Sequence, residues 1–140
     1  MKVRLGNPGR KNRAEHVHID HFDVWSLDHT LSLIIHPALV RLKETKHGYP
    51  ELFEDGMVTP DHWDRQLHFD FIDEEVEDKY LIKKWNDIMD KMIYAFSVIK
   101  DEKAYFGSHD YLWQKDEKVD WDAVQEGLEL FGKYYMNLWD

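Results

Sequence analysis

The sequence contains no cysteine among its 140 residues. A disulfide, a thiolate nucleophile and a cysteine-ligated metal are therefore excluded, and the composition suits a reducing compartment. No apolar run approaches the roughly 18 residues that a membrane-spanning helix needs, and the N-terminal residues lack the apolar centre of a signal peptide. We therefore expect a cytoplasmic protein that does not cross a membrane.

The chain also lacks the short motifs that accompany common catalytic chemistry. It has no Gly-rich phosphate loop, no nucleophile elbow and no zinc-finger spacing. Its formal net charge is −10, although the first thirteen residues carry five basic side chains and no acid. Because an acidic surface repels a phosphate backbone, we do not expect general nucleic-acid binding.

The length fits one domain with a single hydrophobic core. Residues 1–22 are predicted to form a basic extended arm or a short strand, since Val17 and Ile19 alternate with polar residues. Residues 23–140 are predicted to form a single helical domain. The expected fold is all-α, with three long helices in an antiparallel bundle and a short covering segment.

The first long helix should begin near Ser26, whose hydroxyl is placed to cap the first turn. Its apolar stripe comprises Leu27, Leu31, Ile34, Ala38 and Leu42, widened by Ile35 and Leu39. Pro37 lies inside this pattern and should kink the helix, because it removes an amide donor. Gly48 is the expected left-handed cap, and Pro50 prevents continuation.

Two further helices follow from the same spacing of three and four. The second should start between residues 73 and 78 and end before Gly107, and the third should follow Asp120 as its N-cap. Between the first and second helices, Thr59 and Pro60 signal a short helical turn. We expect this intervening segment to cover the core.

Two patterns suggest metal chemistry. The segment containing His16, His18, Asp20 and His21 matches the His-x-His-x-Asp-His signature of the metallo-β-lactamase fold. That fold needs many strands, whereas this chain is predicted to be helical. A chance cluster is therefore the better explanation, and no metal site is predicted, although these four residues remain candidates for adventitious zinc or nickel binding.

The second pattern consists of carboxylates that loosely imitate the magnesium-binding helices of all-α nucleoside triphosphate pyrophosphatases. These are Glu74, Glu75, Glu77 and Asp78, followed by Asp87 and Asp90. On one continuous helix Asp78 and Asp87 would lie about 13 Å apart, too far to share one ion. Solvated acids are the favoured interpretation, and a metal-dependent nucleotide hydrolase remains an alternative.

Polar residues at both ends of the first helix suggest a ligand site instead. Asp28, Lys43 and Lys46 or His47 lie close to one line along this helix. The cations are suited to a phosphate, Asp28 to a sugar or base donor, and Trp25 or Tyr49 to stacking on a base. The alternative is ordinary helix chemistry, in which these charges complement the helix dipole and Trp25 belongs to the core.

Several motifs make the chain similar to an uncharacterised family of small tailed-bacteriophage proteins. The motifs are Asp23-x-Trp25-Ser26-x-Asp28-x-Thr30-Leu31, Ile34-Ile35-x-Pro37-x-Leu39, Leu42-Lys43-x-x-Lys46-His47-Gly48-x-Pro50, Trp85 with Asp90, Met92, Ile93, Ala95 and Phe96, and Phe131-Gly132-Lys133-Tyr134 with Leu138-Trp139-Asp140. The resemblance covers most of the chain from Asp23 onward, and residues 51–71 match poorly. It implies a phage protein of the host cytoplasm. Small phage proteins without catalytic motifs often resemble inhibitors of host defence, one class of which sequesters nucleotide signals between subunits.

Together these observations predict a non-enzymatic, homo-oligomeric protein without a cofactor that binds a small anionic ligand such as a cyclic nucleotide immune signal. The predicted ligand-binding residues are Trp25, Asp28, Lys43, Lys46, His47 and Tyr49. An acidic inhibitor that binds a host protein is the second alternative to this function, beside the hydrolase.

Overall fold

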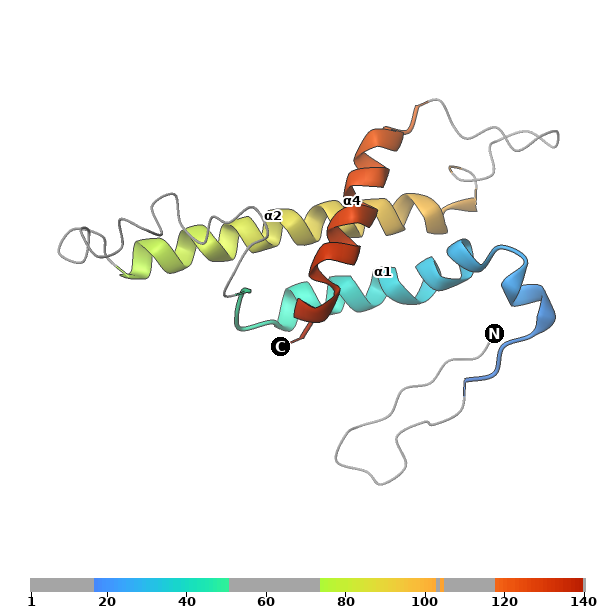
Figure 1. Cartoon of the computed structure of the whole chain (residues 1–140), viewed down its shortest axis with the longest axis horizontal. Coiled ribbons are helices and arrows are strands. Elements are labelled where there is room, and N and C mark those ends of the chain that lie inside the picture. Colours follow the sequence, from blue (N-terminus) through green and yellow to red (C-terminus); the bar gives the residue numbers. More distant parts are fainter. Residues whose placement is uncertain (1–16, 51–73, 103, 105–117, 140) are drawn as a thin grey trace, which may run out of the picture.

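The fold of the described residues is helical. The computed structural model describes residues 17–50, 74–102, 104 and 118–139. Its elements are the short 3-10 helix η1 (His21–Val24), the helices α1 (Leu27–Thr45), α2 (Glu74–Lys100) and α4 (Trp121–Tyr134), and the 3-10 helix η3 (Tyr135–Asn137) (Figure 1). The all-α class predicted from the sequence is confirmed for this part of the chain.

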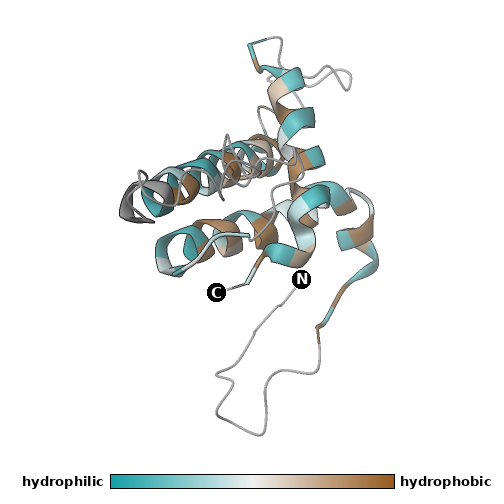
Figure 2. Ribbon diagram, turned by 60° about the vertical axis from the view of Figure 1, so that its left-hand side comes forward, coloured by the Kyte–Doolittle hydropathy of each residue, from teal (hydrophilic) through white to brown (hydrophobic). Residues whose placement is uncertain are grey.

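Helix α2 is the centre of the arrangement. Helix α1 runs antiparallel beside it, while α4 crosses both at a steep angle (Figure 1). Figure 2 shows α1 and α2 obliquely, one above the other, with α4 running steeply against them. Among the described elements, α2 packs against both α1 and α4, whereas the backbones of α1 and α4 do not approach each other closely. The steep crossing of α4 differs from the three-helix antiparallel bundle expected from the sequence.

A glycine explains how closely α4 crosses α2. A Cβ atom at Gly127 would lie 2.3 Å from the carbonyl oxygen of Lys91 and 2.6 Å from the Cβ of Ala95. No L-residue with a side chain fits at these distances, so the two backbones meet where the glycine leaves space. The crossing point is therefore set by a residue that the sequence periodicity does not distinguish from the rest of the helix.

The hydrophobic core follows α2 along its length. Its buried residues include Leu81, Trp85, Met89, Met92 and Phe96 of α2, Leu39 of α1 and Tyr134 of α4. The rings of Trp85 and Tyr134 meet edge to face, with centroids 5.4 Å apart. One helix thus supplies most of the core, and the other two each cover one side of it.

The ends of α1 are only partly as predicted. The helix begins after Ser26, but the Ser26 side chain makes no capping bond, and the Thr30 hydroxyl instead donates to the carbonyl of Asp23 at 2.8 Å. Pro37 lies inside the helix, as expected. The helix ends at Thr45, three residues before Gly48, and Gly48 is not left-handed. The predicted cap is wrong because the chain is already extended at Lys46.

The residues before α1 also differ from the prediction. No strand forms within residues 17–50, where His18 is an isolated bridge position and His21–Val24 is a 3-10 helix. The Asp20 amide donates to the Asp23 carboxylate at 2.9 Å, a local bond that favours a turn over an extended strand. The arm over residues 1–16 and the covering segment with Thr59 and Pro60 lie outside the described residues.

The boundaries of the other helices agree with the sequence. Helix α2 begins at Glu74 and ends at Lys100, inside the predicted limits. The Asp120 carboxylate caps α4 by accepting from the Ala123 amide at 3.0 Å. Within the described residues, no helix is both long enough and apolar enough to span a membrane.

Candidate functional site

The polar line identified on α1 is the side that faces α2. Ser32 and Leu39 are the most deeply buried residues of this helix, with 1% and 3% of their surfaces exposed. Ile35 and Leu42 pack against the core beside them. The Ser32 hydroxyl donates to the carbonyl of Asp28 at 2.7 Å, which satisfies the one buried polar side chain of the helix. The charged ends of this line therefore lie at the two edges of the interface between α1 and α2.

The C-terminal end of α1 is fixed to the N-terminal half of α2 by two polar contacts. Lys43 forms an ion pair with Asp90. The Tyr49 hydroxyl donates to the Asp78 carboxylate at 2.7 Å. Two predicted ligand residues thus have protein partners. We call Lys43, Lys46, His47 and Tyr49, which follow one another at the C-terminal end of α1, the cationic corner.

Lys46 is the cation of this corner whose charge is least compensated. Burial, and then the positive charge of Lys43, lower the pKa of the Lys46 ammonium from its usual value. No described residue forms an ion pair with it. His47 lies next to it and is exposed. A negatively charged group bound at this corner would oppose the lowering of the pKa, because an opposite charge favours the ammonium form.

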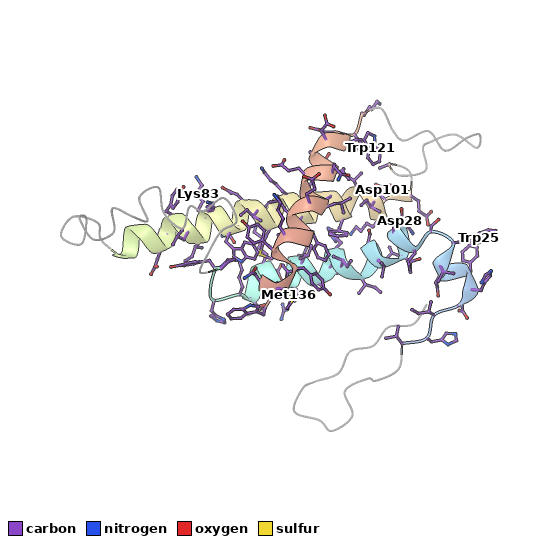
Figure 3. The ribbon with its side chains drawn as sticks, in the orientation of Figure 1. Trp25, Asp28, Lys83, Asp101, Trp121 and Met136 are labelled. Carbon is purple, nitrogen blue, oxygen red and sulfur yellow. The ribbon has the colours of Figure 1, made fainter. Side chains whose placement is uncertain are left out.

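Trp25 and Asp28 lie at the opposite end of α1. Trp25 is 78% exposed, and its ring meets that of Phe22 with centroids 5.8 Å apart, so the suggestion that Trp25 belongs to the core is wrong (Figure 3). The Asp28 carboxylate accepts from the His29 amide at 2.9 Å. At 1.5 Å per residue, Asp28 and Lys43 are about 22 Å apart along the helix. One copy of the chain therefore does not bring the two ends of α1 to one small ligand.

A groove between α1 and α4 was not predicted from the sequence. Its volume is about 400 Å³, and its floor is formed by Phe96 and Ile99 of α2. Leu31 lies on its α1 side and Trp121 on its α4 side. Asp28, Ser32 and Gln125 contribute polar groups to the lining of the groove. The groove exists because α1 and α4 both rest on α2 with their backbones apart, a relationship that spacing within one helix does not reveal.

Two histidines join α1 to the end of α2, and they too were missed by the sequence analysis. Nε2 of His29 lies 3.1 Å from the carbonyl oxygen of Lys100, and the Lys100 ammonium lies 2.9 Å from Nδ1 of His36. Burial, and then the charge of Lys100, lower the pKa of His36. The neutral imidazole of His36 therefore accepts the hydrogen bond from the ammonium.

The described residues cover the two metal patterns only in part. Within residues 17–50, 74–102, 104 and 118–139, no three His, Asp or Glu side chains are placed to hold a metal ion. Nε2 of His18 lies 2.9 Å from Oδ1 of Asp20, while His16 lies outside the described residues. Helix α2 is continuous, so Asp78 and Asp87 are about 13 Å apart along its axis. These two carboxylates do not share one ion within a single chain.

Comparison with known proteins identifies no similar protein. No family model matches the chain, and neither a curated protein nor a solved structure shows significant similarity to it. The resemblance to small phage proteins therefore stays a prediction. The functional argument rests on the geometry of α1 and its neighbours.

Proposed function

We propose that the protein is a non-enzymatic binding protein of the tailed-phage type that holds a small anionic ligand at the cationic corner. The observation that carries this proposal is that Lys46 is a half-buried cation at the end of α1, where burial and then the charge of Lys43 lower its pKa. Such an arrangement costs free energy when it is empty and is stabilised by an anion. The site would act in the cytoplasm of the host.

The contacts around Lys46 define roles for its neighbours. Lys46 would bind a phosphate directly, with His47 as a second donor at the exposed edge. Lys43 already forms an ion pair with Asp90. It would therefore attract the phosphate mainly through its positive charge and share a hydrogen bond between the phosphate and Asp90. Tyr49 is held by Asp78 through its hydroxyl and packs against the core, so it would form a fixed wall of the corner.

A cyclic nucleotide is the ligand class that best fits these groups. It offers a phosphate for the cations and a flat base for an aromatic ring. Sequestration needs binding without chemistry, and two of the carboxylates that suggested hydrolysis are engaged in structural contacts, Asp90 with Lys43 and Asp78 with Tyr49. The proposal therefore assigns this corner to binding.

Isothermal titration calorimetry against cyclic mono-, di- and trinucleotides, with inorganic pyrophosphate as a minimal anion, tests the proposal. The Lys46→Gln substitution should weaken binding by about tenfold or more, because it removes a direct charged contact. Lys83→Gln, which makes the same charge change on the exposed surface of α2, is the matched control and should retain the native affinity. Native affinity in Lys46→Gln, or no binding by any of these anions, contradicts the site.

The same samples separate binding from hydrolysis. After incubation of the protein with nucleotides and magnesium, manganese or zinc, chromatography should recover the nucleotides unchanged. Conversion that is lost in Asp87→Asn would assign hydrolysis to α2 and contradict the non-enzymatic proposal.

A further inference from the structure

The groove between α1 and α4 has the size and the lining of a small-molecule site. Its volume of about 400 Å³ falls within the range of roughly 300 to 1,000 Å³ that such sites occupy. Buried side chains of Phe96, Ile99 and Val124 line it, whereas Leu31 is 43% exposed, so the groove is open to solvent on its α1 side. Trp121, at the start of α4, adds a broad aromatic surface (Figure 3). The groove is therefore suited to a flat, apolar molecule.

The polar groups of the groove are hydrogen-bond acceptors. The Asp28 carboxylate accepts from the His29 amide, and a carboxylate offers about four lone-pair sites to donors. Ser32 is 1% exposed, and its hydroxyl hydrogen is used in the bond to the Asp28 carbonyl, so Oγ remains as an acceptor. The Gln125 amide nitrogen donates to the Glu129 carboxylate at 3.2 Å, and its carbonyl oxygen is a further acceptor. A ligand that matches these groups brings hydrogen-bond donors.

The charge of the groove favours a cation. Asp28 is the one formally charged residue among the described lining residues, and no Lys, Arg or His is among them. Lys100, which follows the lining residue Ile99, directs its ammonium to Nδ1 of His36. A carboxylate beside an apolar site attracts an ammonium group and repels a phosphate or a second carboxylate. Aromatic faces add to this preference, because they also attract cations.

We propose that this groove binds a small aromatic amine, with its ring between α1 and α4 and its protonated amine against Asp28. The ring would pack on Phe96 and Trp121, and the ammonium hydrogens would be shared between Asp28 and Oγ of Ser32. The site takes a ligand of opposite charge to that of the cationic corner, and Lys43 of that corner is about 22 Å from Asp28 along α1. Asp28, which the sequence grouped with those cations, thereby recognises a different ligand.

Three probes that share an indole ring and differ in charge test the class of ligand. Tryptamine carries an ammonium group, tryptophol a neutral hydroxyl and indoleacetate a carboxylate. In methyl NMR of the native chain, tryptamine should give saturable shifts at Leu31, Ile35 and Ile99, with weaker binding of tryptophol and the weakest binding of indoleacetate. Ile82, which is 39% exposed on α2 and outside the groove, is the internal control. Equal affinities for the three probes, or equal shifts at Ile82, overturn the proposal.

Removal of one charge tests the role of Asp28. Asp28→Asn should weaken tryptamine binding by about fivefold, the scale of one partly solvated ion pair, and should change tryptophol binding by less than about twofold. Asp87→Asn makes the same charge change on the exposed surface of α2, outside the groove, and should retain the native affinity for tryptamine. Native tryptamine affinity in Asp28→Asn, or an equal loss for tryptamine and tryptophol, contradicts the ion pair.

A bulkier side chain at the open side of the groove tests the location. Leu31→Trp should cover the apolar lining and abolish the saturable shifts that tryptamine causes at Ile35 and Ile99. Because Leu31 is largely exposed, this substitution should not unfold the chain. Leu33→Trp is the matched control, since Leu33 is 45% exposed and does not line the groove. Native binding in Leu31→Trp, or the same loss in both variants, places the amine elsewhere and overturns the proposal.

Other occupants of the groove give different results. A second copy of the chain would make the Leu31 and Ile99 methyl shifts of the ligand-free protein depend on protein concentration, and that result overturns the proposal. Groove resonances that none of the three probes moves overturn it as well. The cationic corner fails separately: a protein that binds tryptamine and none of the anions contradicts the corner, whereas anion binding that depends on Lys46 in a protein that binds no tryptamine contradicts the groove.

Discussion

The ammonium of Lys100 donates a hydrogen bond to Nδ1 of His36 at 2.9 Å and so ties the last residue of α2 to the middle of α1. This bond needs a neutral imidazole, because a protonated ring has no acceptor. The pKa of His36 is lowered by burial and then by the Lys100 charge. The contact therefore makes the packing of α1 on α2 dependent on pH.

The pH dependence has a definite sign. The unfolded chain takes up a proton on His36 near its ordinary pKa of 6.5, whereas the folded chain does so only at a lower pH. The contribution of His36 to stability is thus present above pH 6.5 and is lost as the pH falls from 6.5 toward the lowered value. His36→Gln, which keeps a hydrogen-bond acceptor, should reduce the fall in the urea midpoint between pH 7.5 and 5.5. An identical fall in both proteins contradicts this role.

Two glycines of α4 should respond oppositely to the same substitution. Gly127→Ala places a methyl group against the backbone of Lys91 and should destabilise the fold by about 2 kcal/mol, since overpacking typically costs about 1 to 3 kcal/mol. A Cβ at Gly132 meets no atom within 4 Å, so Gly132→Ala should stabilise the helix by about 0.5 to 1 kcal/mol. Urea denaturation measures both. Equal effects would contradict the close crossing of α2 and α4.

Tryptophan substitutions distinguish the core from the surface. Trp85 is 2% exposed and packs on Tyr134, so Trp85→Ala should lower the free energy of unfolding by about 3 to 5 kcal/mol. Trp139, which is 71% exposed, serves as the control, and Trp139→Ala should change the free energy of unfolding by less than about 0.5 kcal/mol. A large loss in Trp139→Ala would show instead that the Trp139 side chain is packed against the rest of the protein.

Local sequence signals predicted the helices well where local contacts decide them. Asp120 caps α4 as expected, and α2 spans the range set by its apolar spacing. The predicted end of α1 was wrong because Gly48 was assigned as a cap from its residue type alone. The steep angle of α4 depends on the approach of Gly127 to Lys91, a contact between residues 36 positions apart, which periodicity within one helix does not encode.

The candidate site was predictable in composition but not in geometry. The sequence identified Lys43, Lys46, His47 and Tyr49, which follow one another at the C-terminal end of α1. The sequence could not show that Asp90 pairs with Lys43 and Asp78 with Tyr49, since each pair joins α2 to the end of α1. Nor could it show that Trp25 lies at the far end of α1, because helical phase places residues on a face without bringing them together.

The most direct test of the proposed function is the titration of the Lys46 side chain, followed by NMR of its Cε and Hε nuclei with and without a saturating cyclic dinucleotide. Without ligand, burial and Lys43 should hold the Lys46 pKa below its ordinary 10.5. A bound phosphate should raise this pKa, because an opposite charge favours the ammonium, while the resonances of the exposed Lys83 on α2 should not move. A Lys46 pKa that is the same with and without the bound anion would contradict the cationic corner as the binding site.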